Sequence, residues 1–168
     1  MKAQYTGFEP RGDITYNPSW DVASAAAEIS GTSAQLLPVS LDVLNLVFEG
    51  FVIHFGVAAT REYVEFERYA HNIKKIETQD SVKIFENGKT AYETQLDLGQ
   101  HIFALNESKS DWSFRESRDA GTFVCNSLYY SSLAQNLNRL FIHVPMMKPE
   151  SAQALGRKIG LHFDKVSF

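Results

Sequence analysis

The single cysteine, Cys125, is the residue of the chain best suited to covalent chemistry. It stands in the run Asp119-Ala120-Gly121-Thr122-Phe123-Val124-Cys125-Asn126. An alternating, strand-like segment at 112–115 precedes this run, and apolar residues at helical spacing (129, 133 and 137) follow it. The pattern predicts that Cys125 lies near a helix start, where unpaired N–H groups and the helix dipole stabilise a thiolate and can receive an oxyanion. The alternative is that a lone cysteine serves as a small buried apolar side chain.

A nucleophilic thiol needs a base beside it, and the base needs a group that orients it. His143 ends an apolar strand predicted over 140–145, and ligands gather at the carboxyl ends of strands in open α/β sheets. Because Cys125 also follows a strand, the two side chains could meet. His54 lies inside an apolar strand and is expected in the core. The remaining histidines are expected on the surface: His71, His101 and His162.

The orienting group could be a carboxylate on the strand predicted over 63–69. Alternation places Val64 and Phe66 on one face of this strand, and Glu65 and Glu67 on the other. Tyr63 and Tyr69 share the carboxylate face. On pattern alone, a solvated face is favoured over the wall of a site. Spacing does not choose between the two carboxylates.

Strands and helices must alternate to bring these residues together. Further strands are expected at 2–6, 34–39, 51–55 and 82–85, the last inside a polar excursion over 72–89. Helices are expected at 18–29 with Asn17 as N-cap, at 41–49, at 96–106, after Cys125 and at 149–163. This order predicts right-handed βαβ units, a largely parallel sheet and one domain over 1–168.

The composition narrows the function classes. The chain has 168 residues, of which 44% are hydrophobic, and this suffices for a full core. Its net charge of −4 argues against general binding of nucleic acid or anionic membranes. One cysteine excludes an intrachain disulfide framework and a cysteine-based metal cluster, and a free thiol suits a reducing cytosol. The sequence shows neither a signal-peptide pattern nor a membrane-spanning run, so a cytoplasmic location is expected.

Four motifs, in order along the chain, resemble those of the pyroglutamyl peptidase I family, also called pyrrolidone-carboxylate peptidase. They are Gly7-Phe8-Glu9-Pro10 with Asn17-Pro18-Ser19-Trp20, then His54-Phe55-Gly56-Val57 continuing to Phe66-Glu67-Arg68-Tyr69-Ala70-His71-Asn72, then the run around Cys125, then Phe141-Ile142-His143-Val144-Pro145. The resemblance implies a three-layer α/β/α sandwich around a mostly parallel, twisted sheet. It also implies a cytosolic cysteine exopeptidase that removes N-terminal pyroglutamyl residues from peptides without metal or cofactor.

The motif match also implies the role of each site residue. Cys125 would be the nucleophile, His143 the general base and acid, and Glu67 the partner that orients His143. Glu65 falls two residues before the motif position. The substrate-binding residues implied are Phe8, Arg11, Asn17, Phe123 and Val124. Bacterial members of the family often form tetramers, so a homo-oligomer is a candidate assembly.

The chain departs from the family pattern in two places. Arg11 replaces a phenylalanine that, together with the counterpart of Phe8, sandwiches the lactam ring of the substrate. A guanidinium can stack on a planar group or point into water. The segment Pro38 to His54 is shorter than the family norm, so a short crossover helix is expected. Three hypotheses stay open: an active pyroglutamyl peptidase, a cysteine hydrolase with altered N-terminal specificity, and a weakly active homologue that binds blocked peptide N-termini.

Overall fold

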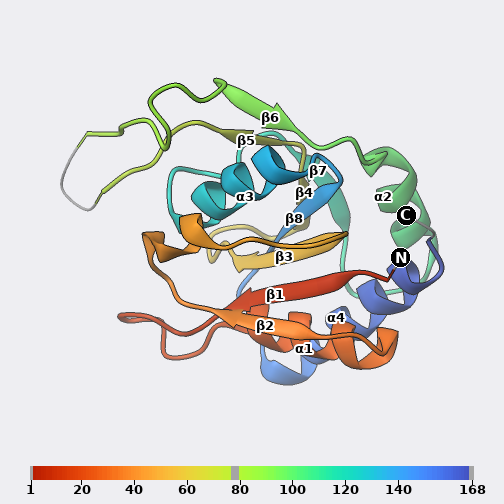
Figure 1. The fold of residues 1–168 in the computed structure, drawn as a ribbon. Helices are drawn as coiled ribbons and strands as arrows, with labels where there is room; N and C mark the ends of the chain where they lie inside the picture. Colours follow the sequence, from red (N-terminus) through yellow and green to blue (C-terminus); the bar gives the residue numbers. More distant parts are fainter. Residues whose placement is uncertain (1, 77–79, 167–168) are drawn as a thin grey trace.

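The computed structural model describes residues 2–76 and 80–166, and a six-stranded sheet lies at its centre (Figure 1). The strand order is β2-β1-β3-β8-β4-β7, and every neighbouring pair is parallel except β4 with β8. The strands are β1 (Gln4–Phe8), β2 (Ala34–Leu37), β3 (Val52–Val57), β4 (Val64–Glu67), β7 (Phe114–Ser117) and β8 (Arg139–Val144). Helices cover both faces, so the predicted α/β sandwich with a mostly parallel sheet is confirmed.

Two helices pack side by side on one face of the sheet, α1 (Pro18–Ser30) and α4 (Pro149–Asp164) (Figure 1). Asn17 caps α1, because its side chain accepts a hydrogen bond from the backbone N–H of Ser19. α2 (Leu98–Glu107) adds Leu98 and Leu105 to the same core. This core is the larger of the two apolar layers, and in Figure 1 α1 and α4 lie below the sheet while α2 lies to its right.

The opposite face is covered by α3 (Val124–Gln135), with a short 3₁₀ helix η1 (Leu41–Asn45) beside it. A separate antiparallel pair, β5 (Tyr69–His71) and β6 (Ala91–Glu93), also packs against α3 (Figure 1). The apolar layer here includes Phe8, Leu128 and Phe141. The first turn of α3 therefore lies over the sheet face that carries the polar residues described below.

Alternation along two neighbouring strands sorts their side chains. On β8, Ile142 packs into the α1–α4 core while Phe141 packs on the α3 side. On β4, Val64 and Phe66 belong to the α1–α4 core. Glu65 and Glu67 therefore face the α3 side, as His143 does.

Several predicted elements are wrong or displaced. Only an isolated bridge between Lys74 and Val82 replaces the strand expected at 82–85. Residues 77–79 of the predicted excursion lie outside the described ranges. The strand expected over 63–69 divides after Glu67, because β5 leaves the main sheet to pair with β6. β7 begins two residues later than the 112–115 prediction.

The N-terminal strand, predicted over 2–6, continues through Gly7 to Phe8. Gly7 pairs with Leu36 of β2 and lies against α1, since a Cβ atom there would stand 2.5 Å from the carbonyl oxygen of Ser19. Glycine is required by this close approach rather than by a turn. Phe8 consequently ends β1 and is buried.

The helix predicted over 41–49 is reduced to the single 3₁₀ element η1. Side chains of α3 hold the backbone around it: Ser131 donates to the carbonyl oxygen of Leu44 (3.2 Å), and Gln135 donates to that of Leu46 (2.8 Å). The short crossover is therefore stabilised by bonds to α3 instead of by its own helical ladder.

Burial corrects two further expectations. Glu65 and Glu67 are buried, so the solvated face predicted for them is wrong. This face lies on the side of the sheet that α3 covers, where the hydroxyl of Tyr129 reaches the backbone of Glu67, and strand alternation alone does not reveal this cover. His101 is also buried, and its Nδ1 lies 3.0 Å from Nε2 of His162. His54 is in the core as predicted, between the hydroxyls of Thr6 and Ser132 at 2.8 Å each.

Within residues 2–76 and 80–166, no helix is long and apolar enough to cross a membrane.

Candidate active site

Cys125 is the second residue of α3 and is half-buried. Phe123, the N-cap residue, is extended and its side chain makes no capping hydrogen bond. The first N–H groups of α3 therefore have no side-chain cap, and they lie where the helix dipole is positive. This surrounding offers hydrogen-bond donors to an oxyanion that develops beside the thiol of Cys125.

Gly56 of β3 lets the thiol lie directly against the sheet. A Cβ atom at this position would stand 2.7 Å from Cys125 Sγ and 2.7 Å from Cζ of Phe141. Gly56 is also the register partner of His143 on β8. The absence of a side chain at Gly56 thus leaves the space in which thiol and imidazole meet.

His143 is buried between Cys125 and Glu67. Its Nδ1 lies 2.7 Å from Oε1 of Glu67, which leaves Nε2 for the thiol. Burial acts to lower the pKa of His143. Hydrogen bonds to Cys125 and Glu67, with the charges of both groups, outweigh burial and raise this pKa to about 9. The imidazole of His143 is therefore held in its positively charged form at neutral pH.

Glu67 is fully buried, and both of the side-chain hydrogen bonds to its carboxylate go to one oxygen. Oε1 accepts hydrogen bonds from His143 and from Nη1 of Arg61 (2.7 Å), whereas Oε2 has no partner among the described residues. The backbone oxygen of Glu67 accepts from the hydroxyl of Tyr129 (2.8 Å). Glu65, the other candidate, is paired with Arg61 and Arg115 instead.

Arg61 and Arg115 are site residues that were not predicted from the sequence. The signal that points to them is the pair of carboxylates two residues apart on one strand face. Such a pair needs counter-charges once the face is buried. A face expected in solvent needs none, so the pattern alone did not indicate these two arginines.

A cavity of about 450 Å³ opens beside Cys125. Its lining is mostly apolar, and all five residues expected to bind substrate contribute to it. The lining residues are Phe8, Arg11, Gly12, Ile14, Asn17, Val39, Val57, Phe123, Val124 and Cys125. The cavity therefore places apolar walls next to the thiol, as a site for a small uncharged group requires.

Three of the lining residues differ in what they offer. Phe8 is buried and presents a ring to the cavity, while Phe123 is exposed at its rim. Asn17 is engaged within the fold, since its Nδ2 donates to the carbonyl oxygen of Glu9 (3.2 Å) and its Oδ1 caps α1. Asn17 thus shapes the loop that carries Arg11.

Arg11 is exposed, and its guanidinium donates a hydrogen bond to the backbone oxygen of Val39. Val39 follows β2 and also lines the cavity. The side chain of Arg11 is therefore fastened to another part of the cavity lining.

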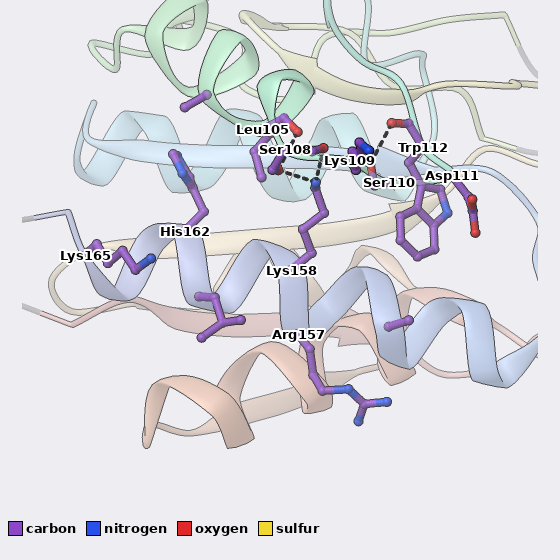
Figure 2. A pocket seen from close by; sticks show the side chains of 13 residues that line it. Leu105, Ser108, Lys109, Ser110, Asp111, Trp112, Arg157, Lys158, His162 and Lys165 are labelled. Atoms are coloured by element: carbon purple, nitrogen blue, oxygen red, sulfur yellow. Dashed lines mark hydrogen bonds between the residues drawn. The ribbon is translucent and has the colours of Figure 1, made fainter.

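A larger hollow, of about 950 Å³, lies between α4 and the segment joining α2 to β7 (Figure 2). Its basic side chains do not converge: Arg157 and Lys165 point in different directions, and Lys158 donates to the carbonyl oxygen of Ser108 (2.9 Å). Burial, and then the charges of nearby basic groups, lower the pKa of His162 to about 4. The described residues lining this hollow include no thiol, so the cavity beside Cys125 is the candidate active site.

Among the described residues, no group of three or more His, Cys, Asp or Glu side chains is arranged to hold a metal ion. The chemistry that the site offers comes from its thiol, imidazole and carboxylate.

Comparison with known proteins gives the same family over most of the chain. The family model described as pyroglutamyl peptidase matches residues 1–159. A pyrrolidone-carboxylate peptidase of Bacillus cereus is 31% identical over 172 residues, covering 88% of this chain and 79% of the relative. A pyrrolidone-carboxylate peptidase of Bacillus cytotoxicus shows the same identity and coverage.

Solved structures give the same result. Pyroglutamyl peptidase I of Bacillus amyloliquefaciens superposes with a TM-score of 0.78 at 25% identity, covering 96% of this chain and 94% of that one. A mutant pyrrolidone carboxyl peptidase of Pyrococcus furiosus has the same fold, with a TM-score of 0.78, 24% identity and 97% of both chains covered.

Proposed function

Since the chain belongs to the pyroglutamyl peptidase family, we propose that it is a cysteine exopeptidase. Its proposed reaction is the removal of an N-terminal pyroglutamyl residue from peptides. The observation that carries the proposal is the meeting of Cys125, His143 and Glu67 beside an apolar cavity. Cys125 is the proposed nucleophile, His143 the base and acid, and Glu67 the group that orients His143.

In the first half of the reaction, the thiolate of Cys125 attacks the carbonyl carbon of the pyroglutamyl residue. A C–S bond forms, and the electron pair of the C=O bond moves to oxygen. N–H groups at the start of α3 receive this oxyanion. When the C–N bond breaks, the imidazolium of His143 gives its proton to the leaving amine, and the shortened peptide departs.

In the second half, His143 is neutral and takes a proton from water. The water oxygen attacks the thioester carbon, and collapse of the intermediate breaks the C–S bond. Pyroglutamate leaves, and the thiolate–imidazolium pair is restored. Glu67 holds His143 in one tautomer during both halves and stabilises its charged form.

The apolar wall of the cavity suits a pyroglutamyl residue, whereas the cation of Arg11 does not. A lactam ring is flat and uncharged, so it favours apolar surface over its faces and polar groups at its edge. Phe8 supplies such a surface. Arg11 brings a cation to the same cavity, and this observation favours a second candidate function, a cysteine hydrolase with altered N-terminal specificity.

Two further proposals rest on coarser support. A cytoplasmic location is proposed because a reactive free thiol persists in a reducing compartment. A homo-oligomer is proposed from the family resemblance, and light scattering of the purified protein tests it.

Turnover of fluorogenic amides tests the proposed function. The pyroglutamyl amide should be hydrolysed, while the alanyl and prolyl amides should be hydrolysed far more slowly. The variant Cys125→Ser serves as the control for contaminating peptidases. Preference for the alanyl or prolyl amide would transfer support to the hydrolase with altered specificity. A folded protein that binds blocked peptides without turning any amide over would support the weakly active homologue.

A further inference from the structure

Arg61 lies in the connection between β3 and β4 and contacts both halves of the candidate site. Its Nη1 donates to Glu67 Oε1 at 2.7 Å and also contacts the carboxylate of Glu65. Its Nη2 donates to the backbone oxygen of Asp119 at 2.7 Å. Asp119 opens the loop that leads to Cys125. One guanidinium therefore joins the carboxylate behind His143 to the segment that presents the thiol.

The charges around Glu67 make this cation necessary. The side chains of Glu65 and Glu67 are 5% and 0% exposed, and both point to the same side of β4. Two buried carboxylates at this spacing repel each other, and a cation in contact with both compensates this repulsion. Arg115 contacts Glu65 and is 53% exposed, whereas Arg61 contacts both carboxylates.

Arg61 is well suited to carry that positive charge. Burial opposes its charged form, but the charges of Glu67 and Glu65 and the hydrogen bonds to them outweigh burial. They raise the pKa of Arg61 above its ordinary value. The guanidinium is thus a fixed cation whose planar fork reaches the carboxylates with one nitrogen and the loop with another.

The same contact determines how Glu67 faces His143. Oε1 of Glu67 accepts hydrogen bonds from the imidazole of His143 and from the guanidinium of Arg61. Oε2 has no hydrogen-bond partner within the described ranges. Without Arg61, the carboxylate would be free to turn away from His143. Such a turn would remove the acceptor that fixes the tautomer of His143.

We propose that Arg61 is a positioning residue of this site, which holds the carboxylate of Glu67 turned toward His143 and joins it to the loop before Cys125. The inference rests on the proposed function, since His143 must serve as base and acid for its orientation to affect turnover. It names a residue that acts through Glu67 and does not touch the substrate.

The test compares Arg61→Met with Arg115→Met. Both changes remove one cation from the same carboxylate cluster, but only Arg61 contacts Glu67. In Arg61→Met, kcat for the pyroglutamyl amide should fall by about 10- to 100-fold with KM changed little, as misplacement of a catalytic group requires. In Arg115→Met, kcat should stay within about twofold of the wild-type value, as expected for a pair with an exposed partner.

A second readout is independent of any substrate. Cys125 is the single cysteine of the chain, so the rate of its alkylation by iodoacetamide can be followed against pH. In Arg61→Met the rise of this rate should move to higher pH, because a Glu67 carboxylate that is no longer held toward His143 stabilises the imidazolium less well. In Arg115→Met the profile should match the wild type. Equal kcat values and equal alkylation profiles for the two variants would overturn the proposal.

Failure of the proposed function is distinguishable from failure of this inference. If the wild type turns over no pyroglutamyl amide, the function is wrong, while the alkylation profiles still decide the role of Arg61. If Arg61→Met does not fold, as judged by thermal unfolding, Arg61→Lys takes its place. Lys keeps the charge but cannot reach Glu67 and Asp119 together, so it should lower kcat, and a wild-type kcat would contradict the proposal.

Discussion

His143 bonds to Glu67 diagonally across two antiparallel strands. In the register of β4 and β8, His143 lies directly opposite Glu65, and Glu67 lies opposite Phe141. The imidazole nevertheless has its Nδ1 2.7 Å from Oε1 of Glu67. Glu65 is not available, because Arg61 and Arg115 occupy its carboxylate. Diagonal neighbours on a sheet face are within reach of long side chains, so the second carboxylate can serve the histidine while the first binds the cations.

This relationship predicts different outcomes for the two carboxylates. Glu67→Gln should keep the shape of the site and lose most of the turnover, because the amide cannot stabilise the charged imidazole or fix its tautomer as a carboxylate does. A change of this kind can cost up to about 10⁴-fold in kcat. Glu65→Gln should be mild. Steady-state kinetics of both variants provide the comparison, and the reverse ranking would mean that Glu65 is the orienting residue.

The pH dependence of turnover should reflect His143. Its pKa is raised to about 9, so the imidazolium is present at neutral pH and is lost as the pH rises through about 9. Above that pH no proton is available for the leaving amine, so kcat/KM should fall. The pH profile of kcat/KM checks this, and an alkaline limb near pH 7 would contradict the contacts described for His143.

Alkylation of Cys125 provides the companion test for His143. In His143→Ala the thiol loses its cationic neighbour, so alkylation should require a higher pH than in the wild type. An unchanged alkylation profile would show that thiol and imidazole are not coupled.

Arg11 should govern recognition of the substrate's first residue. A ring stacked on the open face of the lactam contributes on the order of 0.5–2 kcal/mol, and about 1.4 kcal/mol corresponds to a tenfold change in binding. We therefore expect Arg11→Phe to lower KM for the pyroglutamyl amide by up to about tenfold with kcat nearly unchanged. Arg11→Gln removes the charge without adding a ring and is the matched control. Loss of turnover in Arg11→Phe would instead assign Arg11 to specificity for another substrate.

His54 should make the fold sensitive to acid. Burial, and then the charge of Arg139, lower the pKa of His54 to about 3. Between that value and its ordinary pKa of about 6.5, the unfolded chain binds a proton that the folded chain refuses, so stability falls as the pH falls.

The slope contributed by this one histidine is at most about 1.4 kcal/mol per pH unit. Urea unfolding at pH 7.5 and pH 5 of the wild type and His54→Gln measures it. The variant should be less stable at pH 7.5 but lose less stability on acidification. An equal loss in both proteins would mean that His54 is not held neutral.

Local signals were sufficient to predict where the thiol and the histidine lie. Cys125 follows a strand and opens a helix, and both features are visible in the spacing of nearby apolar residues. His143 is the second-last residue of β8, and the continuous apolar run around it is typical of a buried strand. The sequence therefore indicated that the two residues could meet, although not through which atoms.

The choice of carboxylate and its counter-charges required the folded chain. Strand alternation put Glu65 and Glu67 on one face, but this face is buried in the folded chain, on the side of the sheet that α3 covers. Their burial, and hence the need for Arg61 and Arg115, depends on contacts between segments far apart in sequence. The bond from Arg11 to the backbone of Val39 likewise joins two loops whose approach no local pattern encodes.

Acylation of Cys125 by pyroglutamyl substrates can be tested by titrating this single thiol and following the loss of activity. The protein is alkylated to increasing extents, the modified fraction of Cys125 is measured by mass spectrometry, and turnover of the pyroglutamyl amide is assayed beside unmodified Cys125→Ser. Activity should fall in proportion to the alkylated fraction, and Cys125→Ser should be nearly inactive. Retention of most of the activity by the fully alkylated protein, or by Cys125→Ser, would show that Cys125 is not the acylated residue.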